Sequence, residues 1–311
     1  MRIMTISLLL FLGFNSFIHA NDILPAPKKL AAHSYAWIGP LPGPNFENKG
    51  YRMNLGFVVG NKGIVVIDTG YTEAMATEML NHIRKISNAP IIAAVNTNSQ
   101  PHRFFGNSVF KKAGAKIIST EKEKQRMEAS SGQYSGNIER ILKLKEGSIA
   151  LPALPDTIIT KPMNLDLGDV SVYIESHGGS HTPDSLIVYV AKDKLVYSGD
   201  ILYGNRLLSV IPASNVKQWI ASFKKLNKYA NAQFVPGHGQ PGPLKDFEFS
   251  TLSYLQSLHK HMAKSVDEGL EAQDAIETFN QSAYSKLVNF NILAGRNASW
   301  GYLEAEKAAF E

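Results

Sequence analysis

Four side chains of this sequence have the chemistry to bind a metal ion together. Each follows an apolar run and lies in a turn rich in glycine or proline, and the four are His102, His181, Asp200 and His238. Side chains at the ends of separate strands can converge at one edge of a sheet. Three imidazoles and one carboxylate suffice for a tetrahedral zinc ion, or for three ligands and an open water position. The same set would also suit iron or manganese.

The other histidines have plainer interpretations. They lie in the N-terminal segment, in an irregular stretch, on expected helices or before a glycine pair, and they are His19, His33, His82, His177, His259 and His261. A single histidine is more often structural than a ligand. Spacing alone therefore does not decide between a metal site and four structural side chains.

Composition excludes several kinds of site. The chain has no cysteine, so it can form no disulfide, no thiolate metal ligand and no cysteine nucleophile. Hydrophobic residues at 44% and charged residues at 19% are typical of an ordinary globular protein. Lysine and arginine are scattered along the chain, so no nucleic-acid surface is expected.

The N-terminus is typical of a secretory signal peptide. Arg2 provides a positive start, Ile6 to Phe14 form an apolar run, and Ala20 ends the segment with a small residue. The run is too short to span a bilayer, which argues against a membrane anchor. We expect cleavage before Asn21 and export to a bacterial periplasm, with no membrane contact afterwards.

Two rounds of strands and helices must position the candidate ligands. The first is expected to contain strands at 55–59, 64–67, 91–95 and 115–119 and helices at 72–86, 104–113 and 121–129. The second is expected to contain short strands within 157–176 and 185–198, a helix at 216–226, a strand at 233–235, and helices at about 246–268, 271–279 and 300–310.

This order predicts an α/β fold of four layers, in which two sheets pack together with helices outside, an αβ/βα sandwich. The expected parts are a signal peptide at 1–20, a main domain at 21–245 and a helical C-terminal extension at 246–311 packed on it. In that extension Tyr254, Leu255 and Leu258 are spaced as one helical stripe, which favours internal packing or a homodimer surface.

Five motifs in order resemble the metallo-β-lactamase superfamily, and the resemblance runs from about residue 50 to 245. They are DTG (68–70), NTNSQPHRFFGN (96–107), GGSHTPDSLIVY (178–189), YSGDIL (197–202) and VPGHGQPG (235–242). The resemblance implies the αβ/βα metallo-β-lactamase fold and zinc-dependent hydrolysis. It also implies a structural role for Asp68, which resembles the superfamily's aspartate at a strand end. The loop and the C-terminal residues Arg296, Asn297 and Tyr302 look like the exported quinoprotein relay system metallohydrolases. The loop also resembles the single-zinc, carbapenem-hydrolysing β-lactamases.

The loop departs from the superfamily's His-x-His-x-Asp-His pattern. Alignment on Gly106 and Asn107 places Asn98 and Gln100 at the first two histidines, His102 at the aspartate and Arg103 at the last histidine. Amide oxygens are weak partners for zinc, so the first metal position is expected to be weak or empty.

The remaining family positions are kept. His181 matches a ligand of the first metal, Asp200 the bridging carboxylate and His238 a ligand of the second metal. The resemblance therefore implies a single-metal site of His102, Asp200 and His238. Arg103 is a permanent cation, and it could bind a substrate carboxylate or phosphate or neutralise Asp200 in place of a lost metal.

Two functions follow from these residues. The first is hydrolysis of a small ester, thioester, lactone, lactam or phosphoester by one metal-activated water. In this hydrolase Asp200 could act as a base, and Asn98 or Gln100 could donate to the developing oxyanion. The alternative is a metal-poor, non-catalytic accessory protein of a periplasmic quinoprotein system, in which the same pocket binds a small molecule or a quinoprotein partner.

Overall fold

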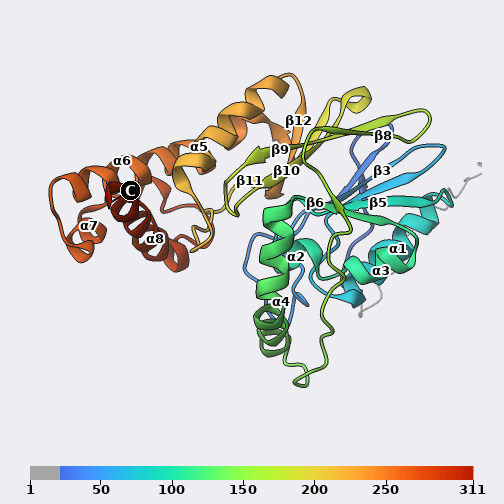
Figure 1. Ribbon diagram of the computed structural model, residues 1–311, viewed down its shortest axis with the longest axis horizontal. Helices are drawn as coiled ribbons and strands as arrows, with labels where there is room; N and C mark the ends of the chain where they lie inside the picture. The colour runs from blue at the N-terminus through green and yellow to red at the C-terminus, as the bar shows by residue number, and fades with distance from the viewer. Residues whose placement is uncertain (1–21, 311) are drawn as a thin grey trace, which may run out of the picture.

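Two mixed β-sheets pack face to face in the computed structural model, which describes residues 22–310 (Figure 1). A buried cluster contributed by both sheets, including Val65, Val95, Val188 and Val235, fills the space between them. Helices cover the outer face of each sheet through two further apolar clusters. The predicted αβ/βα metallo-β-lactamase sandwich with additional C-terminal helices is confirmed.

The first sheet has seven strands that lie side by side in chain order. Its antiparallel hairpin β3/β4 continues into parallel pairing of β4 with β5, β5 with β6 and β6 with β7. The strands are β1 (Lys28–Lys29), β2 (Ser34–Trp37), β3 (Leu55–Val59), β4 (Ile64–Ile67), β5 (Ile91–Val95), β6 (Lys116–Ser119) and β7 (Thr157–Ile158).

The second sheet has six strands in the order β13-β12-β11-β10-β9-β8. Only β11 and β12 pair in parallel, so the carboxyl ends of these two neighbouring strands lie at the same edge of the sheet. The strands are β8 (Met163–Asp166), β9 (Ser171–Gly178), β10 (Ser185–Val190), β11 (Leu195–Tyr203), β12 (Gln233–His238) and β13 (Gly242–Pro243).

The helices divide between the two outer faces, with α1, α3 and α4 on one side of the strands and α6, α7 and α8 gathered at the far end in Figure 1. The helices are α1 (Glu73–Ile86), α2 (Pro101–Phe104), α3 (Asn107–Lys112), α4 (Glu121–Leu142), α5 (Val216–Lys225), α6 (Tyr254–Asp267), α7 (Ala272–Thr278) and α8 (Phe290–Phe310). A π-helical turn at Glu248–Ser253 leads into α6.

Several local predictions are confirmed by these bounds. The hairpin at 55–67 and the strand at 91–95 form as expected, and Thr72 caps α1 by accepting a hydrogen bond from the Met75 backbone N–H at 3.1 Å. Tyr254, Leu255 and Leu258 are fully buried within the chain, so this stripe serves internal packing.

Several helix and strand boundaries were predicted wrongly. The helix expected at 104–113 is interrupted at Gly106, where an added Cβ would lie 2.0 Å from the Thr69 carbonyl oxygen, so α2 and α3 are separate. The helix expected to end at 129 continues to Leu142, because its buried face, including Met127 and Ile138, outweighs the low helix propensity of its serines and glycines. The last helix begins at Phe290 rather than 300, and β12 extends to His238.

The predicted signal peptide lies outside the described residues. Among residues 22–310, no helix is both long and apolar enough to cross a membrane.

Candidate functional site

Three of the four predicted ligands lie together at the edge where β11, β12 and the loop after β5 meet. His102 on α2, Asp200 on β11 and His238 at the end of β12 each offer one ligand atom, and these atoms all lie within 4.8 Å of one another. His102 Nε2 is 3.5 Å from Asp200 Oδ2, and His238 Nε2 is 3.3 Å from Asp200 Oδ1. All three side chains are buried.

Asp200 lies inside β11 rather than at the strand end that the sequence predicted. The register between β11 and β12 shifts around Gly199, which has φ +52°. An added Cβ at Gly199 would lie 2.4 Å from Thr97 Oγ1, so only glycine fits. This irregularity in the strand places the Asp200 carboxylate among the ligands instead of in the core.

His238 is oriented as a neutral imidazole whose Nε2 is free to bind a cation. Its Nδ1 lies 2.8 Å from the Arg52 carbonyl oxygen, which only accepts, so Nδ1 carries the proton. Burial, and then the nearby Arg206, lower the pKa of His238 to about 3. The Nε2 lone pair therefore faces the Asp200 carboxylate, an arrangement that a cation between them would stabilise.

His181 has the same tautomer but is not part of the three-residue group found among residues 22–310. Its Nδ1 lies 2.7 Å from the Ser209 carbonyl oxygen, and burial lowers its pKa to about 4. Its Nε2 is thus an acceptor beside the group.

His102 contributes a buried Nε2 without a hydrogen-bond partner in the described part of the chain. Its Nδ1 is 3.5 Å from Arg52 Nη2, too long a contact to fix the tautomer. Burial, and then the adjacent Arg103, lower its pKa well below the usual value. A buried, unpartnered imidazole nitrogen is costly unless an ion or water completes it.

Arg103 is fully buried and uses all five of its N–H groups on the protein. Nε and Nη2 donate to the two carboxylate oxygens of Asp200 at 3.2 and 2.6 Å. Nη1 donates to Asp68 at 3.0 Å and to the Asn54 carbonyl oxygen at 2.8 Å, and Nη2 also donates to the Gly237 carbonyl oxygen at 3.1 Å. No N–H remains for a substrate anion, so the geometry matches the predicted neutralising role of Arg103 and not the substrate-binding one.

Arg103 also sets the charge of its two partners. Burial alone would raise the pKa of Asp200, but the guanidinium holds it well below the usual range, so this carboxylate stays ionised. For Asp68 burial prevails and raises the pKa to about 6, despite Arg103 and the Thr97 hydrogen bonds. The predicted structural role of Asp68 fits these contacts.

The remaining capacity of Asp200 is small. Oδ2 accepts from Asn98 Nδ2 at 2.8 Å and from Arg103, which fills both of its lone pairs. Oδ1 accepts from Arg103 and retains one lone pair, on the atom closest to His238 Nε2. A metal ion would therefore bind Asp200 through Oδ1. The side-chain amide oxygen of Asn98, Oδ1, is also engaged, because it accepts from the Gln100 backbone N–H at 2.8 Å.

Glu123 on α4 joins the two loops that carry the histidines. Its carboxylate accepts from the Ser99 backbone N–H at 2.8 Å, the Thr182 hydroxyl at 2.7 Å and the Asp184 backbone N–H at 2.6 Å. It has no exposed surface. Nothing in the sequence distinguishes Glu123 from the other charged residues of this helix.

A cavity of about 310 Å³ opens beside the ligand group. His181, Tyr203, His238 and Gln100 line it, together with three arginines, Arg52, Arg206 and Arg296, and no carboxylate side chain. Tyr203 and Arg206 follow Asp200 in sequence, whereas Arg52 lies before the first predicted strand of the main domain, at 55–59, where no motif marks it.

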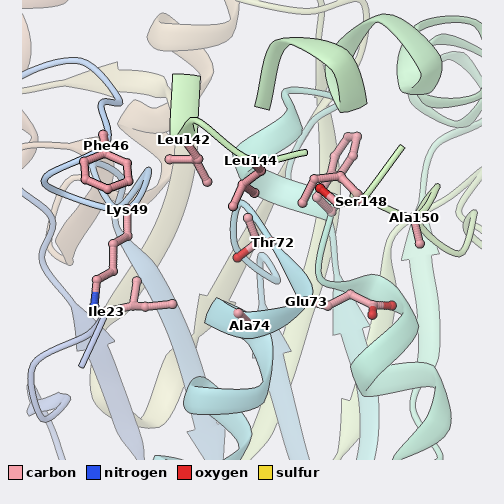
Figure 2. A pocket seen from close by; sticks show the side chains of 12 residues that line it. Ile23, Phe46, Lys49, Thr72, Glu73, Ala74, Leu142, Leu144, Ser148 and Ala150 are labelled. Carbon is pink, nitrogen blue, oxygen red and sulfur yellow. The ribbon is translucent and has the colours of Figure 1, made fainter. Parts of the chain in front are cut away.

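A second cavity, of about 390 Å³, lies near the start of α1 and the end of α4 (Figure 2). Its lining is largely apolar, including Phe46, Leu142 and Leu144, and contains none of the predicted site residues. The candidate chemistry is confined to the arginine-lined cavity.

Comparisons with known proteins agree with this geometry. A family model for the metallo-beta-lactamase superfamily matches residues 52–238. Metallo-beta-lactamase IND-1 of Chryseobacterium indologenes is 26% identical over 222 residues, covering 70% of this chain and 82% of that protein. A linear primary-alkylsulfatase from a Pseudomonas strain is 24% identical over 255 residues, 70% of this chain but 48% of that protein. A metallo-beta-lactamase structure from Pontibacter korlensis, 19% identical, superposes with a TM-score of 0.61 over 74% of this chain and 98% of that chain, which shows the fold alone.

Replacing Arg103 tests its role between Asp68 and Asp200. We expect Arg103→Met to lower the free energy of unfolding by about 3–5 kcal/mol, because it leaves two buried carboxylates without their cation. Arg103→Lys should recover only part of this loss, since lysine cannot supply the forked donors. Urea denaturation measures both variants, and a loss below about 1 kcal/mol for Arg103→Met would contradict the assignment.

Replacing Glu123 tests the connection between the loops. In Glu123→Gln the new amide N–H₂ faces a backbone or hydroxyl donor, so one buried donor loses its acceptor. We expect a loss of about 1–3 kcal/mol in unfolding free energy, measured by the same denaturation. The exposed Glu128→Gln on the same helix is the matched control and should leave stability unchanged; equal stability of the two variants would refute the role.

Proposed function

The chain belongs to the metallo-beta-lactamase superfamily, and we propose that it is a hydrolase that uses one metal ion held by His102, Asp200 and His238. Members of this superfamily are mostly metal-dependent hydrolases. The observation that carries the proposal is the convergence of three buried ligand atoms at one point beside a cavity.

The donor set fits a single ion. Ligand atoms bound to tetrahedral zinc at about 2.0–2.1 Å lie roughly 3.3 Å apart. Asp200 Oδ1, the oxygen with a free lone pair, lies 3.3 Å from His238 Nε2, and one ligand atom from each of the three residues lies within 4.8 Å of the others. The unpartnered Nε2 of His102 and the free Nε2 of His238 also match what a cation requires. Two imidazoles and one carboxylate suit zinc best, with iron or manganese as alternatives.

When bound there, the ion would supply Lewis-acid activation of water. The protein's own side chains would supply the proton acceptor and the hydrogen-bond donor that hydrolysis also requires. Asp200, with a single lone pair left on Oδ1, serves as a ligand and not as the base that the sequence suggested. The Nε2 of His181 is the acceptor best placed for a water proton, and Gln100 on the cavity wall can donate to a developing oxyanion.

Arg103 favours a second candidate function, a metal-poor binding protein. Its guanidinium already neutralises Asp200, and Arg52 and Arg206 add positive charge beside the histidines. The positive charges of these three arginines would repel a divalent cation at the ligand group. The quinoprotein accessory role, and export to the periplasm through the N-terminal segment, remain proposals supported by sequence alone.

Metal binding separates the two functions. We expect the purified mature protein to bind about one zinc ion per chain. The variant His238→Ala should not retain zinc, because the substitution removes one of the three ligands. His259→Ala, remote from the group, is the matched control. Elemental analysis after dialysis measures both. Uptake below about a tenth of an equivalent in excess zinc would favour the binding protein instead.

A substrate panel tests hydrolysis itself. It contains β-lactams and alkyl sulfates, named for the relatives, together with esters, thioesters, lactones and phosphoesters. We expect zinc-dependent turnover of at least one class, reduced at least about 100-fold in His238→Ala. Turnover that survives both chelation and this substitution would exclude the proposed site.

A further inference from the structure

Two arginines beside the proposed metal group have no acidic partner among residues 22–310. Arg206 is 3% exposed, and Arg52 is half-buried with its Nε enclosed. Every ion pair of the site's carboxylates within that range goes to Arg103, His102 or His238. Arginine is seldom buried unless it is paired, because its charge must leave water. The two side chains therefore point to a missing anion.

The same two side chains also carry unused donors. The Nε–H groups of Arg52 and Arg206 are buried and have no hydrogen-bond partner in the described chain. The contact of Arg206 Nη1 with His238 Nδ1, at 3.5 Å, joins two donors, because His238 Nδ1 already donates to a carbonyl. A buried unpaired donor costs stability, so the protein gives these two guanidinium groups neither a counter-charge nor full hydrogen bonding. Both Nε atoms are enclosed, so a ligand in the cavity would bind the terminal N–H groups of the two arginines, and its oxygens would supply the missing negative charge.

Both arginines line the 310 Å³ cavity, and each lies beside a different histidine of the metal group. Arg52 Nη2 is 3.5 Å from His102, and Arg206 Nη1 is 3.5 Å from His238. Arg296, which is exposed, lines the same cavity. No carboxylate side chain lines this cavity, so no acidic group of the protein competes there with a bound anion for the arginines. The volume is at the lower end of small-molecule sites.

We propose that this cavity binds the oxyanion group of a small substrate, a carboxylate, sulfate or phosphate, between Arg52 and Arg206. The proposal rests on the hydrolase function above and assigns its substrate class. The forked N–H groups of arginine match the paired oxygens of such groups. The bound group lies next to the histidines, so the bond to be cleaved is close to the negative charge of the substrate.

Anion binding is tested first on metal-free protein, so that it does not depend on hydrolysis. Sulfate, phosphate and acetate are titrated at constant ionic strength against chloride, and the unfolding temperature is followed. We expect saturable stabilisation by at least one of these oxyanions, weakened at least about tenfold in Arg206→Gln and Arg52→Gln. Arg140→Gln, an exposed arginine on α4, is the matched control and should behave as the native protein does.

Stability in chloride alone distinguishes a binding role from a structural one. Removing an unpaired buried charge should leave Arg206→Gln at least as stable as the native protein. Arg206→Lys, which keeps the charge but loses the forked N–H groups, should fold and still lose oxyanion affinity. Oxyanion stabilisation equal to that of chloride, or unchanged in all three variants, would overturn the proposal.

A substrate pair then separates this inference from the proposed function. An ester with a neutral acyl group is compared with its carboxylate-bearing analogue in the zinc-loaded enzyme. We expect kcat/KM to favour the anionic ester by about tenfold or more, and the preference to vanish in Arg206→Gln. Equal hydrolysis of both esters would refute the substrate class but leave the hydrolase. Oxyanion binding without any hydrolysis would keep the anion site and refute the hydrolase.

Discussion

The guanidinium of Arg103, held between Asp68 and Asp200, is the interaction on which the site depends. It joins the end of β4, the loop before β3, β11 and β12 through five hydrogen bonds. A buried arginine stabilises a site when its charge and its donors are satisfied, and every N–H of Arg103 is. The two sheets are therefore connected at the site by protein groups alone, and the positions of Asp200 and His238 do not require an ion to hold them.

The arginines of the site divide into two kinds. Arg103 is saturated by the protein, and Arg52 and Arg206 are not. The first fixes the charge and orientation of Asp200, and the others leave positive charge at the wall of the cavity. With one lone pair left on Asp200, the histidines carry most of the capacity to bind a metal. A site of this kind accepts negative charge more readily than a second cation.

The fold could be predicted largely from periodicity and motif order, because buried strands such as 91–95 and the capped helix after Thr72 are local patterns. Convergence of His102, Asp200 and His238 was also predictable from their places near predicted strand ends, although Asp200 lies inside β11 and His238 is the last residue of β12. The contacts of Arg103 were not, because two of its acceptors are backbone carbonyls of Asn54 and Gly237, distant in sequence. The role of Arg52 could not be predicted either, because it depends on the side chains that surround it in the folded protein. Nor could the break at Gly106, where the chain packs closely against the Thr69 backbone.

Asp68, His102 and Arg103 belong to the first sheet and its helices, whereas Asp200 and His238 belong to the second sheet. Between these two groups of residues the chain crosses an exposed segment, residues 143–148, and β7 is the one strand of the first sheet that follows it. Neither half contains a complete ligand group or an acceptor set for Arg103. The site is thus a composite of two fragments, and in a chain divided at that segment the ligand group and the acceptors of Arg103 would form only when the two pieces reassociate.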